Sequence, residues 1–337
     1  MLELSDIQSS LQELQDYYAQ LQAQQVTPAW IGGGISIEPR SEAVPYLWRW
    51  QDLRPQAMRA AELVGTQQAE RRVLRLTNPK LSGAASNTLV ANIQIVMPGE
   101  IARAHRHSAA ALRLIIEGRG GYTVVNGERV PMFPGDLVLT PNWTWHDHAN
   151  DTDAPMIWLD GLDTPLIRML EAGFYEEYHQ ERQDFGAAVN ASQWHYPMSE
   201  MRTALQRMAA ANTGDPHEGI VLEYKNRVTG GPVMPTIACH MQLLRPGETT
   251  RARRPCLLHQ LSRGGGCRLF CSGRAAARLG RQGRVHSADM DLLRTRQQRK
   301  PSGVLVQLQR RASDAGLEPL SGRDQAVTAS DALSFLA

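Results

Sequence analysis

Three histidines lie in two separate segments that both have the composition of short β-strands and tight turns. His105 and His107 follow Gly99 closely, and His146 ends a segment that begins near Gly135. Residues two apart in a strand point to the same side, so His105 and His107 are expected to face one interior together. A third imidazole from a neighbouring strand completes one triangular face of a metal ion. The fold must therefore bring two distant β-segments together.

The region around these histidines predicts a β-sandwich or small barrel. From about Ser86 to Leu162 there are short β-rich runs, among them "TLVANIQIVMPGE", "LRLIIEG", "GGYTVVNGERV" and "PMIWLDGL". Turn sequences such as "PGE", "NGE" and "PGD" separate them, with no intervening helix. Helical spacing is instead found in the first 24 residues and in the segments "VPYLWRWQDLRPQAMRAAELV" and "TPLIRMLEAGFYEEYHQER". We interpret the first of these as an oligomer-forming or docking helix and the last as a connector.

Part of the β-region recurs later in the chain. "GGPVMPTIACHMQLLRPGETTRARRP" is similar to "NTLVANIQIVMPGEIARAHRH", with Gln242 in the place of Gln94. This repeat predicts a duplicated β-domain. In the second copy Arg253 and Pro255 replace the two histidines, so no second metal site is expected. The remaining sequence is rich in glycine and arginine, which indicates either a second domain that has degenerated or a shifted reading frame.

Four regions follow from these patterns: an N-terminal helical segment over 1–85, a catalytic β-domain over 86–165, a helical connector over 166–228 and a degenerate second β-domain over 229–337.

Composition fits a soluble globular chain, with 42% hydrophobic and 21% charged residues among 337. No apolar run approaches the ~20 residues of a membrane span. The arginine-rich C-terminal region lacks interleaved aromatic residues and any nucleic-acid motif, so no nucleic-acid partner is expected. Four cysteines without a secretory signal favour a cytoplasmic protein. Cys267 and Cys271 are one pair without a second, so no metal site is expected on them.

Other polar residues share the expected facing of the three histidines. His148 has the parity of His146 and is expected to act as an acid or base, or to contact substrate, rather than to be a fourth ligand that would close the open side of a metal. Asp147 should point outward as a solvated residue. Asn92 and Gln94 share one face of the preceding strand, where they can donate hydrogen bonds to a substrate or serve the architecture.

Arg113 has the same parity as His105 and His107, so an unbroken strand would place its guanidinium inside the barrel. A buried guanidinium requires a counter-charge. A substrate carboxylate held through two hydrogen bonds would supply one. The alternative is a structural ion pair with Glu117 or another acid.

The two histidine segments together resemble the two-part motif of the cupins. The first part is Gly99, five residues, His105 and His107; the second is Gly135, five residues, Pro141, His146 and Asn150. The general motif carries a glutamate after the second histidine, where this chain has Ala111 and Leu112. More specifically, the chain resembles the gentisate 1,2-dioxygenase family, which also includes enzymes acting on salicylate and 1-hydroxy-2-naphthoate. The similar segments are "PYLWRWQDLRP", "ERRVLRLTNP", "PGEIARAHRHSAAALRLIIEG", "GDLVLTPNWTWHDHAN", "WLDGLD" and "GGPVMPTIACHMQLLRPGE".

This resemblance implies a mainly β bicupin fold of double-stranded β-helix (jelly-roll) barrels with N-terminal and connecting helices, and a homo-oligomer, by analogy a tetramer. The degenerate second cupin is a departure of this chain from the family. It implies Fe(II) on His105, His107 and His146, and Arg113 on the substrate carboxylate. Gln94 and His148 would line the pocket, with either Arg71 or Arg72 contributing. The implied reaction opens gentisate with O2 to maleylpyruvate in aromatic-compound catabolism. Alternatives are the same chemistry on salicylate or 1-hydroxy-2-naphthoate, an inactive metal-binding cupin, or an oxygen-independent isomerase.

Overall fold

The computed structural model describes residues 4–32, 42–44, 46–66, 68–186, 193–211 and 214–245, and the backbone of four later strands. The chain divides into two compact units, Met1–Arg40 and Ser41–Ala337. Among the described residues, no helix is both long enough and apolar enough to span a membrane.

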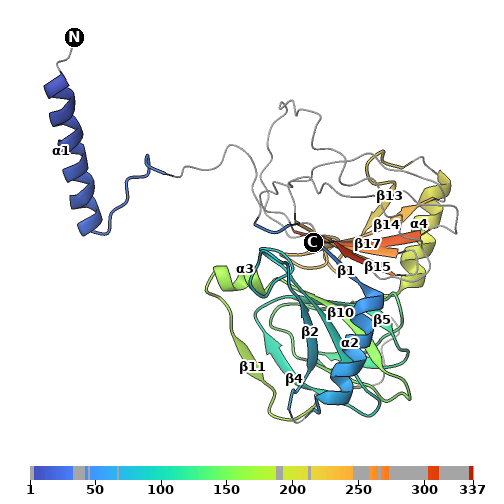
Figure 1. Ribbon diagram of the computed structural model, residues 1–337. Coiled ribbons are helices and arrows are strands. Elements are labelled where there is room, and N and C mark those ends of the chain that lie inside the picture. Colours follow the sequence, from blue (N-terminus) through green and yellow to red (C-terminus); the bar gives the residue numbers. More distant parts are fainter. Residues whose placement is uncertain are drawn as a thin grey trace. The chain divides into compact units, whose positions relative to one another are not determined.

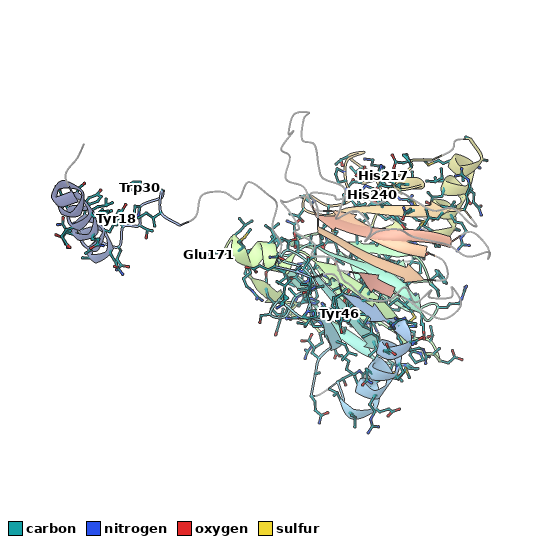
Figure 2. All side chains as sticks on the ribbon, turned by 45° about the horizontal axis from the view of Figure 1, so that its top comes forward. Tyr18, Trp30, Tyr46, Glu171, His217 and His240 are labelled. Atoms are coloured by element: carbon teal, nitrogen blue, oxygen red, sulfur yellow. The ribbon has the colours of Figure 1, made fainter. Side chains whose placement is uncertain are left out.

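The first unit contains one long helix, α1 (Leu4–Ala23), which confirms the helical spacing of the N-terminal sequence. The chain then turns, and the indole Nε1 of Trp30 donates a hydrogen bond to the Tyr18 hydroxyl at 3.2 Å. Both residues are labelled in Figure 2. Leu11 and Leu14 of α1 are exposed within this unit. The expected docking or oligomer-forming role of this helix stays a prediction.

The second unit contains two facing antiparallel sheets, which confirms the predicted β-sandwich. Their strands are β2 (Arg72–Leu76), β3 (Val90–Val96), β4 (Ile101–His107), β5 (Ala111–Glu117), β6 (Tyr122–Val125), β7 (Glu128–Pro131), β8 (Leu137–Thr140), β9 (His146–Ala149), β10 (Met156–Leu162), β11 (Tyr175–Glu177) and β12 (His195–Tyr196). One sheet has the order β12-β8-β5-β10-β3-β2, and the other has the order β11-β4-β9-β6-β7.

The tight turn between β6 and β7 sets the register in which these two strands pair. Between β6 and β7 the two loop residues Asn126 and Gly127 both have positive φ, 48° and 77°. A two-residue hairpin loop of this kind requires positive φ at both positions, which asparagine and glycine adopt most readily. Val125 therefore pairs directly with Glu128.

A third sheet contains the repeated segment. Its strands are β1 (Leu47–Arg49), β13 (Ile220–Glu223), β14 (Ala238–Leu244), β15 (Leu258–Gly264), β16 (Cys267–Ser272), β17 (Gly303–Arg310) and β18 (Ser334–Leu336), in the order β1-β18-β15-β17-β14-β13 with β16 beside β15. Gln94 and Gln242 are each the fifth residue of a seven-residue strand, β3 and β14, as the repeat predicts. Arg253 and Pro255 lie outside the described residues, as do the side chains of Cys267 and Cys271.

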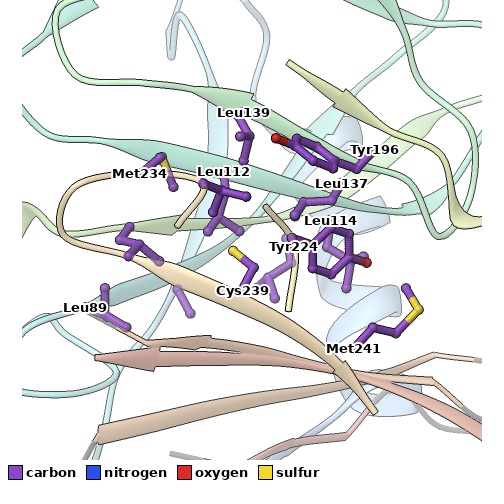
Figure 3. Packing of buried hydrophobic residues seen from close by; sticks show 14 of the residues in the cluster. Leu89, Leu112, Leu114, Leu137, Leu139, Tyr196, Tyr224, Met234, Cys239 and Met241 are labelled. Atoms are coloured by element: carbon purple, nitrogen blue, oxygen red, sulfur yellow. The ribbon is translucent and has the colours of Figure 1, made fainter. Parts of the chain in front are cut away.

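The main hydrophobic core lies on the outer face of the six-stranded sheet. Leu112 and Leu139 of that sheet belong to one buried cluster with Cys239 and Met241 of β14, and Figure 3 shows them gathered between the strands. The helix α2 (Trp50–Leu63) contributes Trp50 to the same cluster, and α4 (Met198–Ala211) lies beside β13 and β14 in Figure 1. The inner face carries polar side chains beside a smaller apolar cluster that includes Ile115, Val138 and Trp158.

The connector departs from its prediction. The sequence predicts a helix over Thr164–Arg182, but only Thr164–Met169 is helical (α3), and residues 175–177 form β11 instead. The helical propensity of this segment is a weak preference, and backbone pairing with the free edge of β4 overrides it. Arg106 of β4 strengthens the pairing, because its guanidinium lies 4.3 Å from the rings of both Trp143 and Trp145 while it forms an ion pair with Glu176 of β11 at 2.6 Å.

Replacing Gly118 by alanine is expected to lower the free energy of unfolding by about 3 kcal/mol, because Gly118 has φ +91° and its new Cβ would lie 2.5 Å from the Pro155 carbonyl oxygen. Gly99 is the matched control: it has φ +77° but nothing within 4 Å, so Gly99→Ala should cost only about 1 kcal/mol. Urea unfolding of both variants measures the difference. Equal losses would contradict the close packing at Gly118.

Candidate metal centre and active site

The fold brings the three predicted histidines together between the two sheets. β4 contributes His105 and His107, and β9 contributes His146, which is the direct cross-strand partner of His105. One nitrogen of each ring lies within 4.8 Å of the others, and among the described residues these three form the one group arranged to hold a metal ion. The ring centroids of His105 and His146 are 4.1 Å apart. The antiparallel register therefore closes the triangle that the sequence spacing predicts.

The far nitrogen of each ring is bound to the backbone. His105 Nδ1 lies 3.0 Å from the Arg103 carbonyl oxygen, His107 Nδ1 lies 2.7 Å from that of Ala109, and His146 Nδ1 lies 2.9 Å from that of Thr144. A carbonyl oxygen only accepts, so each Nδ1 carries the proton and donates. Each Nε2 therefore presents its lone pair, which is the arrangement that metal-binding histidines require.

Burial keeps these rings neutral. Burial lowers the pKa of His105 to about 2 and that of His107 to about 4, and the positive charge of Arg71 and Arg113 acts in the same direction. The pKa of His146 is also lowered well below its usual range, first by burial and then by its charged and imidazole neighbours. Neutral imidazoles are the form that binds metal, so protons do not compete for this site near neutral pH.

The residues present fit a metal ion. His146 Nε2 is buried and has no hydrogen-bond partner, although a buried polar atom normally has one. His105 Nε2 accepts a hydrogen bond from Arg71 Nη1 at 2.9 Å. Three neutral nitrogen donors on one side suit iron, zinc or copper rather than magnesium or calcium, which prefer oxygen.

Arg113 points into the same interior, as its parity predicts, and it is buried. Its structural partner is Asp160 of β10, whose carboxylate lies 3.4 Å from Arg113 Nε, and Nη1 donates to Thr140 Oγ1 at 2.8 Å. Glu117, the partner considered from sequence, pairs instead with Arg54. Burial lowers the pKa of Arg113 to about 10 and raises that of Asp160 to about 6, while each charge opposes the effect on the other.

Asn92 and Gln94 of β3 are buried, and the pairing of β3 with β10 and of β10 with β5 places Asn92 on the same face as Arg113 and Asp160. Asn92 pairs with Asp160 across β10, and Asp160 pairs with Arg113 across β5. Directly paired residues share a face of the sheet, so all three side chains face the interior that holds the histidines. Asn92 Oδ1, Gln94 Nε2 and Arg113 Nε are buried without a hydrogen-bond partner.

His148 lies beside the triad, 5.9 Å from His146 between ring centroids, and 5.2 Å from the Trp158 ring. Its Nδ1 is 2.8 Å from the Thr123 hydroxyl. Burial and the charges of Arg113 and Arg71 lower its pKa well below the usual range.

The prediction that Asp147 is solvated is wrong. Asp147 is completely buried, because the connector crosses over it. The backbone N–H and side-chain amide of Gln183 donate to Asp147 Oδ2 at 3.1 and 3.0 Å. Burial raises the pKa of Asp147, although the hydrogen bonds from Gln183 act in the opposite direction.

The structure separates the two arginines that the sequence left undecided. Arg71 reaches the triad through its hydrogen bond to His105. Arg72 instead donates to the Val64 carbonyl oxygen at 3.0 Å and forms an ion pair with Glu100. Arg71 therefore belongs to the site, and Arg72 to the surrounding architecture.

Two residues of the interior were missed by the sequence reasoning. Asp160 lies in the segment "WLDGLD", and its parity with Trp158 in a predicted strand would have placed it inside the barrel. Thr123 carried no signal, because a threonine in a strand is usually chosen for its branched shape.

Known proteins share both this fold and this site-bearing segment. Residues 92–161 match the cupin domain family. The chain is 37% identical to gentisate 1,2 dioxygenase 1 of Aquipseudomonas alcaligenes over 72% of this chain and 77% of that protein. It is 41% identical to 5-aminosalicylate 1,2-dioxygenase of a Comamonas species over 68% of each. The chain belongs to the gentisate 1,2-dioxygenase family. The resemblance seen in the sequence is thereby confirmed, and the chain is a ring-cleaving dioxygenase of cupin fold.

Solved structures extend the similarity over nearly the whole dioxygenase. Salicylate 1,2-dioxygenase from Pseudaminobacter salicylatoxidans aligns with 96% of this chain and 93% of its own, at 27% identity and a TM-score of 0.68. A structure of the same enzyme described as an adduct with gentisate aligns with a TM-score of 0.66 at 27% identity. The mainly β cupin class predicted from the sequence is confirmed. A metal cofactor is consistent with this family and with the histidine triad.

The buried histidines give the metal-free dioxygenase a defined pH dependence. The pKa of His107 is lowered from 6.5 to about 4, so its contribution to stability is present above pH 6.5 and is lost as the pH falls towards 4. Between pH 6.5 and 5 the His107→Gln variant should lose about 2 kcal/mol less unfolding free energy than the wild type, measured by urea unfolding. Parallel pH profiles for the two proteins would contradict this assignment.

Proposed function

We propose that the dioxygenase binds Fe(II) on His105, His107 and His146 and opens gentisate with O2 to give maleylpyruvate. The observation that carries this proposal is the set of buried polar atoms that form no hydrogen bond in one interior. They belong to Asn92, Gln94, Arg113 and His146, with Arg71 Nε nearby. A polar ligand is what would satisfy such atoms.

The interior offers two guanidinium groups to an anionic ligand. Asp160 lies 3.4 Å from Arg113 Nε, and the exposed Glu70 pairs with Arg71 at 3.0 Å. A benzoate carboxylate can bind a guanidinium through two hydrogen bonds. If a metal takes His105 Nε2, Arg71 Nη1 gives up its bond to His105 and can bind the carboxylate together with Arg113, while Nη2 keeps its bond to Glu70.

The remaining residues orient and protect the ring. The amides of Asn92 and Gln94 would hold its polar edge, and His148 would take or return the proton of a phenolic hydroxyl. An apolar wall that includes Val125, Met132 and Trp158 excludes water. Bound Fe(II) would bring the ring and O2 together and pass electrons between them. Both oxygen atoms enter the product as the bond between the carboxylated and adjacent hydroxylated carbons breaks, so no external reductant is needed.

Salicylate and 1-hydroxy-2-naphthoate are the competing substrates. The similarity to a 5-aminosalicylate 1,2-dioxygenase supports a salicylate as the alternative substrate. Each has the carboxylate and adjacent hydroxyl of gentisate but lacks its second, para hydroxyl. Oxygen uptake with Fe(II) and each compound, read together with the absorbance of the ring-opened product, decides between them. Turnover without O2, or stoichiometric iron without uptake on any hydroxybenzoate, would overturn the proposed reaction.

His107→Ala should abolish both iron retention and oxygen uptake, because two imidazoles hold a metal much more weakly than three. Metal analysis of the purified protein and an oxygen electrode measure the two effects. His179→Ala is the control, since His179 is an exposed histidine of the connector. Full iron content in His107→Ala would rule out the proposed ligand set.

Arg113→Lys should raise KM for the aromatic acid about 10- to 100-fold, because lysine keeps the charge opposite Asp160 but cannot bind a carboxylate through two parallel hydrogen bonds. Iron content should be unchanged. Arg59→Lys, on the exposed face of α2, is the matched control. An unchanged KM in Arg113→Lys would refute the carboxylate-binding role.

A further inference from the structure

A single hydroxyl interrupts the apolar wall beside His148. Thr123 of β6 is the direct cross-strand partner of His148 of β9, so the two side chains lie on the same inner face. Both are buried, and the neighbouring inward residue of β6 is Val125. The Thr123 hydroxyl is 2.8 Å from His148 Nδ1 and 3.4 Å from the sulfur of Met132. Valine would fill the same space, so the hydroxyl has a role that shape alone does not explain.

The direction of these two hydrogen bonds follows from counting protons. A threonine hydroxyl has one proton to donate, and a thioether sulfur can only accept. If the Thr123 hydroxyl donates to Met132, its oxygen must accept a proton from His148 Nδ1. This arrangement forms two hydrogen bonds, whereas donation from Thr123 to His148 forms one and leaves the sulfur without a donor.

In a neutral imidazole only one nitrogen carries a proton. With that proton on Nδ1, which is held at Thr123, Nε2 is the nitrogen left with a lone pair.

We propose that Thr123 and Met132 act as positioning residues that hold His148 protonated at Nδ1, so that Nε2 is a ready acceptor for a phenolic proton of the substrate. This inference rests on the proposed role of His148 in the ring-opening reaction. In this form the ring accepts the proton at Nε2 while Thr123 continues to accept at Nδ1. The opposite tautomer would present an N–H and would have to shift its proton first.

The tautomer can be read without any reaction. In ¹⁵N NMR spectra of the metal-free full-length protein, protonated and unprotonated ring nitrogens resonate far apart, and comparison with His148→Gln assigns the signals. We expect a protonated Nδ1 in the wild type and in Thr123→Ser, which keeps the hydroxyl. In Met132→Leu the hydroxyl loses its sulfur acceptor and turns to His148, so the proton should move to Nε2.

Met156→Leu is the matched control, because Met156 belongs to the same buried cluster but Thr123 donates to Met132 instead. It should leave the His148 signals unchanged. A wild-type ring protonated at Nε2, or a Met132→Leu spectrum identical to that of the wild type, would overturn the inference.

Activity gives the second readout. With Fe(II) and gentisate, Thr123→Val should lower kcat about 100-fold with little change in KM, and Thr123→Ser should restore it. A Thr123→Val enzyme with wild-type kcat, or a Thr123→Ser enzyme as slow as Thr123→Val, would count against the positioning role. If the wild type fails to act on any hydroxybenzoate, the proposed reaction is at fault, and the NMR comparison still decides the tautomer.

Discussion

The antiparallel pairing of β4 with β9 is the constraint on which the rest of the site depends. It places His146 directly opposite His105, and alternation along β4 adds His107 to the same face. Backbone carbonyl oxygens then take the proton-bearing nitrogen of each ring. The donors that face inward are fixed by main-chain geometry, so the site does not rely on further side chains to choose the correct tautomer of its ligands.

The two faces of the six-stranded sheet differ, because only the inner face carries buried polar groups of the site beside its apolar residues. Its outer face belongs to a large apolar cluster with α2 and β14, whose burial supplies the hydrophobic stabilisation of this unit. Its inner face carries Asn92, Arg113 and Asp160, three polar groups that would be costly in an apolar core. Packing on the outer face stabilises the register of the strands. That register places the polar atoms that form no hydrogen bond on the inner face, toward one interior.

Much of this could be read from the sequence, because periodicity determines facing. The spacing of His105 and His107, the matched Gly135 segment and the parity of Arg113 were sufficient to predict a β-sandwich with these residues inside. Partners across strands could not be predicted, since they depend on register. Asp160 rather than Glu117 pairs with Arg113 for this reason. Asp147 faces outward as alternation requires, but tertiary packing of Gln183 turns that outward position into a buried one.

The strand β11 has a consequence for how this enzyme can be divided. It comes from the connector, yet it covers the edge of β4, the strand that carries two of the three histidines. Gln183, still further along, donates two hydrogen bonds to Oδ2 of Asp147, which is next to the third histidine. A fragment cut at residue 165, where the sequence pattern of the β-domain ends, would expose one strand edge and one buried carboxylate beside the three histidines. The smallest fragment that preserves the site therefore extends beyond the cupin motif. An insertion in this part of the connector would disturb the histidines, as one in an ordinary linker would not.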